Sequence, residues 1–432
     1  MGAGQRLALA FSTYRAFATA TKLGSAFLSG ASDFAFQASA RSFNGLSKRG
    51  LPGQYLKLMR PGSIEDQKLA VRRGLIAEEW ASRTAAQSRY VMEEMSSEFS
   101  RRLAEGVLRV SLLARHTQTM RWVYGMETLA TYTEAAGKSF ADLAPKLRGA
   151  LERYGMGSED WDKLRSAPME RDRGADWIAP HKLDDQELGS RFMEMVHTET
   201  DIAVPVSDLN TRAVMNSQFT RGSAIGELGR SMFQFKSFGV SVMLAQWQRI
   251  MTLNSGDALT YMIGFLLGTT LTGALALELK SLAAGRDPRP MWDLDFLKAS
   301  LLQGGGFGIF GDLLFSDQNR AGGGFAQTLA GPMVDDVQGL RNVVTAKDPR
   351  RQLVREAKGL IPGNNIWYSR LVLDRMLADQ IEQMVNPAYG EGYRNQERYA
   401  REQGTSFYWR PGDTAPARAP DFSNALEEGP AQ

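Results

Sequence analysis

Residues 258–277 read ALTYMIGFLLGTTLTGALAL, twenty consecutive residues without a charged side chain. As an α-helix this run would be roughly 30 Å long, about the thickness of the hydrocarbon core of a bilayer. Asp257 precedes it and Glu278 follows it. We therefore expect one long apolar helix, which either contacts a membrane or lies buried in a large helical protein. The residues expected to contact a membrane are Ala258, Leu259, Ile263, Phe265, Leu266, Leu267, Leu271 and Leu275.

Three glycines interrupt this apolar run, at Gly264, Gly268 and Gly273, and threonines lie between them. Small residues on transmembrane helices let two backbones approach closely. The pattern therefore predicts close packing of this helix against a neighbour.

The composition of the whole chain is that of a globular protein. Of its 432 residues 23% are charged and 43% are hydrophobic, which is too polar for a polytopic transporter. The net charge of +3 does not indicate a general nucleic-acid binder. The absence of cysteine excludes disulfides, thiolate metal sites and a cysteine nucleophile. The amino terminus lacks the compact apolar core of a secretory signal, so we expect synthesis in the cytoplasm without export.

The first sixty residues are strongly basic, with Asp33 as their single acid. Small and apolar residues alternate there at helical spacing, which is typical of a segment that contacts an anionic surface such as a membrane or nucleic acid. The basic residues proposed for this contact are Arg6, Arg15, Lys22, Arg41, Lys48 and Arg49.

Apolar residues recur every three or four positions along much of the chain, so the expected fold class is mainly α, an elongated multi-helix body. One such stripe, Met92, Met95, Phe99, Leu103, Val107 and Val110, is expected to be core. We expect a basic amphipathic segment (1–60), a helical bundle (61–170), a connecting region (171–221), an apolar, membrane-affine helical region (222–316), a helical region (317–393) and a polar, proline-rich, partly disordered tail (394–432).

Residues 306–311 form a literal GxGxxG motif, with Asp335 and Asp336 downstream. A dinucleotide site needs a strand before the glycines and a helix after them, and the preceding sequence is helical in pattern. We therefore predict a structural role, a close helix contact or a re-entrant turn, and no cofactor. The glycines of this predicted hinge are Gly304, Gly305, Gly306, Gly308 and Gly311.

Motifs for catalysis are missing from the sequence. It contains no P-loop, no GxSxG and no HExxH, and its three histidines are far apart in sequence. Glu134, Glu194 and Glu199 could act as paired carboxylates, but their spacing is also that of solvated helix faces. We predict no catalytic, cofactor-binding or metal-binding residue.

Several phrases in order along the chain resemble the carboxy-terminal region of large internal virion, or DNA-ejection, proteins of tailed bacteriophages and prophages, which are also described as large polyvalent proteins. The resemblance covers most of the chain. The phrases are TKLGSAFLSGASD (21–33), LERYG with DWDKLR (151–165), GELGRSMFQFKSF (226–238), GGFGIFGDLLFS (305–316), GP (331–332) and PGNNIWYSR (362–370).

This resemblance implies a structural virion protein that travels inside the capsid and helps form a helical, membrane-associated conduit for DNA across the host envelope. The implied partners are portal and other ejection proteins, the host membrane and DNA, in a homo-oligomer. The implied locations are the bacterial cytoplasm, the virion interior and then the envelope. The alternatives are a soluble cell-wall hydrolase resembling a lytic transglycosylase, and a helical scaffold without membrane contact.

Overall fold

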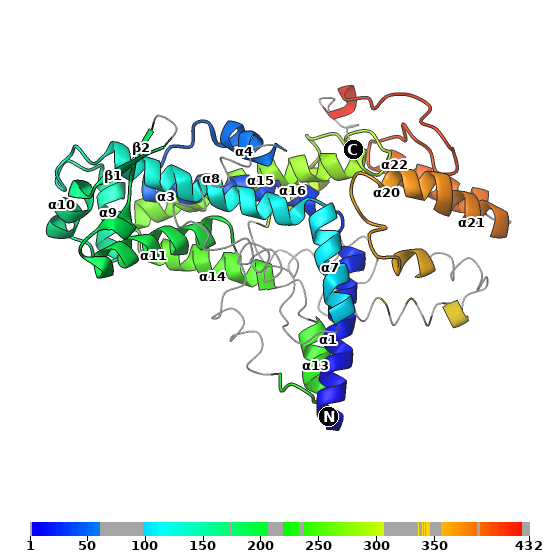
Figure 1. The fold of residues 1–432 in the computed structure, drawn as a ribbon. Coiled ribbons are helices and arrows are strands. Elements are labelled where there is room, and N and C mark those ends of the chain that lie inside the picture. Colours follow the sequence, from blue (N-terminus) through cyan, green and yellow to red (C-terminus); the bar gives the residue numbers. More distant parts are fainter. Residues whose placement is uncertain are drawn as a thin grey trace.

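The protein is mainly helical, as predicted (Figure 1). The computed structural model describes residues 2–60, 98–172, 175–205, 219–232, 237–305, 336, 339, 341, 343–345, 356–386 and 389–425. The predicted hinge glycines Gly306, Gly308 and Gly311 lie outside these residues, as do Met92 and Met95.

Helix α15 (Ser255–Leu282) contains the apolar run and extends it at both ends. Asp257 lies in its first turn and Lys280 in its last, so both charges are favourably placed for the helix dipole. It packs lengthwise against α3 (Ser32–Asn44) and α16 (Leu294–Gln303), and it also contacts α14 (Ser237–Met251). The prediction of one long apolar helix is confirmed.

The largest hydrophobic core lies at one end of the molecule, where α3 meets α4 (Leu51–Met59), α8 (Leu113–Glu134) and α11 (Gln186–Ala203). Trp161, Tyr132 and Phe192 are fully buried there, with ring centroids 5.5–6.0 Å apart around Tyr132. Helices α9 (Pro145–Arg153) and α10 (Ser158–Ser166) complete this core. Helix α11 is thus part of the main core, although 171–221 was expected only to connect other regions.

A small antiparallel hairpin, β1 (Met169–Asp172) and β2 (Ala175–Ile178), precedes the short 3-10 helix η1 (Pro180–Lys182). Ile178 is buried against α8, and its N–H donates to the Thr133 hydroxyl at 3.0 Å. The hairpin was not predicted, because the sequence indicated only a connecting region from residue 171 onward.

Helices α1 (Ala3–Lys22), α7 (Glu98–Val110) and α13 (Ala224–Met232) form an arm that projects from this body (Figure 1). The chain turns sharply between α7 and α8 at Leu112, whose φ is 66°. Helix α7 packs on α1 through Val107, whereas Phe99 and Val110 are 76% and 50% exposed. The expectation that both are core is wrong, because the arm covers only one face of α7.

The carboxy-terminal part comprises α20 (Arg370–Leu373), the π-helical turn η3 (Asp374–Ala378), α21 (Asp379–Val385) and α22 (Tyr389–Glu402). Residues 403–422 are irregular, and a last 3-10 turn, η4, spans Ser423–Ala425. The tail expected from residue 394 therefore begins as helix α22. Short helix α2 (Ala26–Ser29) links α1 to α3 at the other end of the chain.

Candidate membrane-facing surface

Helix α15 exposes an apolar stripe to solvent. Its large side chains recur every four residues, which places them along one slowly turning face of a helix. The members of this α15 stripe are 40–71% exposed, and they are Leu259, Met262, Ile263, Leu267, Leu271 and Leu275. Five of the eight predicted membrane-contact residues are therefore fully on the surface, and Ala258 and Leu266 are half-buried.

Phe265 is the exception among the predicted contacts, because it points into the protein. Its ring stacks on Phe36 with centroids 5.8 Å apart, and Val242 closes the same buried cluster. Phe265 fixes α15 to α3 and α14, and it does not belong to the exposed stripe.

Of the three glycines expected to pack closely, only Gly273 does so. An added Cβ at Gly268 would make an ordinary contact with Ala35, and one at Gly264 would have no atom within 4 Å. A Cβ added at Gly273 would lie 1.9 Å from the Ser300 carbonyl oxygen, and one added at Gly304 would lie 1.8 Å from the Thr269 carbonyl oxygen. The backbones of α15 and α16 thus touch at this point, in the manner of small-residue contacts between membrane helices. Of the predicted hinge, Gly304 makes this helix contact, and Gly305 follows it in a turn with φ of 72°.

Within the part of the chain that the structure describes, α15 alone is long and apolar enough to cross a membrane, and only 28% of its most apolar window is buried. A buried core helix of a soluble protein passes the same test of length and composition. The exposure of the α15 stripe is therefore the stronger observation. It also shows that α15 is not buried in the protein in this conformation, which was one of the two expectations for the apolar run.

The carboxy-terminal helices carry a second apolar stripe, which the sequence analysis missed. Its members are 37–85% exposed and follow α20, η3 and α21, namely Val372, Leu373, Met376, Leu377, Ile381, Met384 and Val385. Their helical spacing was visible in the sequence, but Asp374, Arg375 and Asp379 between them lower the mean hydropathy. We call this set the α20–α21 stripe.

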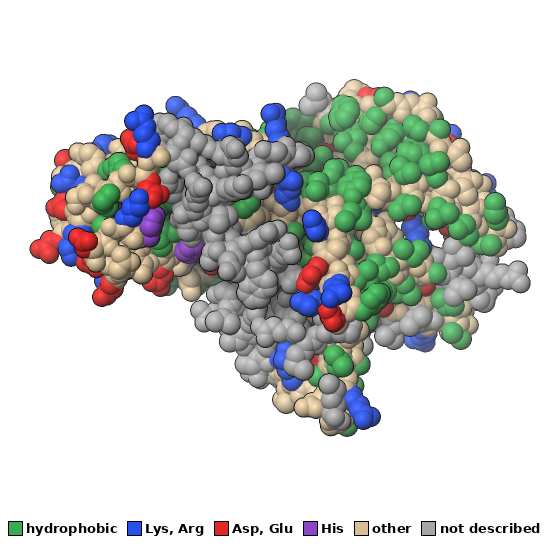
Figure 2. Space-filling view, viewed as in Figure 1, with side chains coloured by type: hydrophobic (Ala, Val, Ile, Leu, Met, Phe, Trp, Pro, Cys, Tyr) green, Lys and Arg blue, Asp and Glu red, His purple; other side chains and the backbone are tan. Residues whose placement is uncertain are grey.

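Hydrophobic side chains gather toward the end of the molecule that holds α16 and α20–α22, whereas charged side chains gather over α9–α11 (Figure 2). Met291, Trp292, Leu294 and Leu297, at and before the start of α16, are also exposed. Exposed apolar surface of this extent marks a membrane or protein interface.

The predicted anionic-surface residues divide into two groups. Arg6, Lys48 and Arg49 are exposed. Arg15 is buried, and its guanidinium donates to the Glu227 carboxylate at 2.8 Å and to the Ser231 hydroxyl at 3.1 Å. A buried cation requires such partners, so Arg15 joins α1 to α13 and does not face a membrane or nucleic acid.

Arg41 and Lys22 are likewise bound within the protein. Arg41 is fully buried and donates to the backbone oxygens of Ser47 and Val123, at 2.8 and 3.1 Å. Lys22 is partly exposed and pairs with Asp336 at 2.7 Å. These two contacts, with that of Arg15, correct the expectation of a continuous basic surface over residues 1–60.

The three candidate catalytic carboxylates lie in different environments. Glu134 and Glu194 are exposed, whereas Glu199 is buried and pairs with Arg249. The Asn44 amide also donates to Glu199 at 2.6 Å, and the Tyr154 hydroxyl at 3.3 Å. An ion pair and two hydrogen bonds therefore bind the Glu199 carboxylate within the protein, where it joins α11 to α3, α14 and the end of α9.

His116 forms a buried hydrogen-bonded chain with two residues of neighbouring elements. Its Nε2 lies 3.0 Å from the Asp33 carboxylate and its Nδ1 lies 2.8 Å from the Tyr55 hydroxyl. Burial raises the pKa of Tyr55 well above its ordinary value, so this hydroxyl stays protonated. The chain joins α3, α4 and α8 and satisfies their buried polar groups.

Among the described residues, no group of three or more histidine or carboxylate side chains is placed to hold a metal ion. Comparison with known proteins finds no matching family model, no matching curated protein and no matching solved structure.

Proposed function

We propose that this chain is a structural phage or prophage virion protein of the internal, ejection type, which helps deliver DNA across the host envelope in a helical, membrane-associated conduit. The α15 stripe is the observation that carries the membrane part of this proposal. The resemblance of several phrases to those of ejection proteins supports the virion part. The proposed partners are other virion proteins, the host membrane, DNA and further copies of the chain.

The proposed contact with the membrane uses side chains that are already exposed. Each large apolar side chain removed from water contributes about 1.5–3 kcal/mol, so a stripe of six favours transfer to a lipid surface strongly. The packed face of α15 can stay against α3 and α16 during this contact, because the stripe lies on the other face.

Flotation of the full chain with phosphatidylcholine vesicles tests the membrane contact. The variant Leu267→Glu/Leu271→Glu places two charges in the stripe without disturbing a buried side chain, and we expect it to bind at least about tenfold more weakly. The matched control Leu56→Glu/Ile225→Glu changes two exposed apolar residues elsewhere, at 58% and 83% exposure, and should bind like the wild type. Equal recovery of all three proteins in the lipid-free fraction would contradict the proposal.

The virion part of the proposal is tested separately, by mass spectrometry of purified particles from the host that carries the gene. The chain should copurify with portal and tail proteins and remain after nuclease and protease treatment of intact particles. Absence of the chain from such particles would contradict the proposed role in ejection, and only the proposed membrane contact would then stand.

A further inference from the structure

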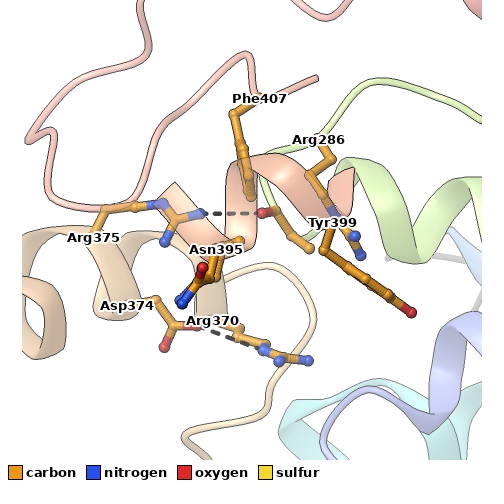
Figure 3. Close-up of a pocket in the computed structure, with 9 residues that line it drawn as sticks. Arg286, Arg370, Asp374, Arg375, Asn395, Tyr399 and Phe407 are labelled. Atoms are coloured by element: carbon orange, nitrogen blue, oxygen red, sulfur yellow. Dashed lines mark hydrogen bonds and ion pairs between the residues drawn. The ribbon is translucent and has the colours of Figure 1, made fainter. Parts of the chain in front are cut away.

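A pocket of about 410 Å³ lies just beyond the end of α15, where the chain meets α20, η3 and α22 (Figure 3). Ala284 forms one side, two residues after the last residue of α15. The side chains that give the pocket its chemistry are Arg286, Arg370, Arg375, Asn395, Tyr399 and Phe407.

Arg375 builds the wall of this pocket. Its three guanidinium nitrogens donate to the Asp379 carboxylate at 2.9 Å and to the carbonyl oxygens of Trp409 and Ala284, each at 3.3 Å. The guanidinium also lies 5.8 Å from the centre of the Phe407 ring. These contacts hold η3, the start of α21, the irregular tail and the end of α15 together around the cavity.

The pocket has an excess of positive charge. Asp374 is shared by two cations, Lys358 at 2.6 Å and Arg370 at 3.7 Å. Arg286 adds a further guanidinium beside Tyr399 (Figure 3). Three arginines and one carboxylate, Asp374, thus line the pocket, and Lys358 and Asp379 lie one contact further out. This excess of positive charge favours an anionic ligand. Arginine and an amide donor such as Asn395 suit the oxygens of a phosphate.

The position of the pocket indicates where that phosphate comes from. Leu373 follows Arg370 by three residues within α20, so the α20–α21 stripe begins beside the pocket wall. A basic pocket beside apolar side chains is the arrangement of a protein that binds anionic lipids at a membrane surface.

We infer that this pocket binds the phosphate of an anionic phospholipid headgroup, with the acyl chains against the α20–α21 stripe. This inference rests on the proposed membrane association. It predicts a preference for anionic vesicles that depends on Arg286 and Arg370 and not only on net charge.

The test compares binding to vesicles of phosphatidylcholine alone with binding to vesicles that also contain phosphatidylglycerol. Wild type should prefer the anionic vesicles, and Arg286→Gln/Arg370→Gln should lose that preference by about tenfold, because each cation near an anionic surface contributes appreciably to binding. Lys138→Gln/Arg171→Gln removes the same charge from exposed sites after α8 and on β1, at the end of the molecule opposite α22 (Figure 1), and should keep the preference. Equal binding of the pocket variant and wild type to neutral vesicles shows that the variant is folded.

Three results would overturn the inference: no anionic preference in wild type, retention of the preference in the pocket variant, or equal loss in both variants. Soluble glycerol phosphate, measured by calorimetry, distinguishes the sources of the phosphate. Tight binding of glycerol phosphate without any anionic-vesicle preference would assign the pocket to a free phosphate compound instead. Failure of wild type to bind neutral vesicles would contradict the proposed function, but the calorimetric arm would still report on the pocket.

Discussion

At the residue scale, Asp287 holds the irregular tail against the body. Its buried carboxylate accepts hydrogen bonds from the Arg418 guanidinium, the Ser406 hydroxyl at 2.6 Å and the Asp421 N–H at 2.9 Å. Burial alone would raise the pKa of Asp287, but these hydrogen bonds lower it below the ordinary value. The ionised form is therefore the one that binds residues 406–421.

We predict that Asp287→Asn loosens this segment by about 2–3 kcal/mol, since hydrogen bonds to a charged group are among the stronger ones. Trypsin should then cleave faster after Arg418, whose side chain is 40% exposed. The matched variant Asp413→Asn, in the exposed part of the same segment, should be cleaved like the wild type.

The attachment of this segment should also depend on pH. The stabilisation from the ionised Asp287 carboxylate is fully present above its ordinary pKa of about 3.9 and is lost as the pH falls through its lower folded pKa, so the segment of the wild type should loosen in acid. Equal cleavage of Asp287→Asn and wild type at neutral pH would contradict this role.

Single residues also show where prediction from sequence stops. Arg6, Arg15 and Arg41 look alike in a basic amino-terminal segment, yet only Arg6 is exposed. The partner of Arg15 is Glu227, more than two hundred residues later, and the partners of Arg41 are mainly backbone oxygens. No local pattern encodes such contacts, because burial is set by tertiary packing.

At the scale of elements, the contact between α15 and α16 requires glycine at position 273, whereas position 264 of the same helix has room for a side chain. Gly273→Ala would force a methyl group into the backbone of α16, and we expect it to destabilise the protein by about 1–3 kcal/mol or more. Gly264→Ala in the same helix meets no atom within 4 Å and should stabilise it by about 0.5–1 kcal/mol, because alanine favours the helix. Urea unfolding of both variants measures the difference, and equal effects would show that the helices are not in backbone contact here.

Helices differed in how well the sequence predicted them. Helix α15 was predicted from its uncharged run, because length and composition are enough to identify an apolar helix. The α20–α21 stripe was missed because charged residues share its turns and a π-helical turn at Asp374–Ala378 shifts its spacing. The pocket lined by Arg286, Arg370 and Arg375 could not be predicted, since it joins segments about ninety residues apart in sequence.

At the scale of the whole molecule, the structure allows two ways for α15 to meet a membrane. In one, the α15 stripe docks on the lipid surface while the fold stays intact. In the other, α15 leaves α3 and α16 and inserts alone. Release would expose Phe36, Phe265 and Phe296, each buried now, at a cost of about 1.5–3 kcal/mol for each side chain. It would also separate the glycine contact between α15 and α16. Docking of the α15 stripe has none of these costs, so we expect the folded protein to dock on a membrane without releasing α15.

Hydrogen exchange with and without neutral vesicles distinguishes these two ways. Docking predicts slower exchange in α15 and in α20–α21 on adding vesicles, with α8, α11 and α16 unchanged, because the packing of these three helices is not disturbed. Release predicts faster exchange in α3 and α16, which would lose their largest neighbour. The Leu267→Glu/Leu271→Glu variant is the control, since it should show no change in any helix. Faster exchange in α16 of the wild type, absent from this variant, would show that membrane contact opens the fold, and the conduit would then be built from a rearranged chain.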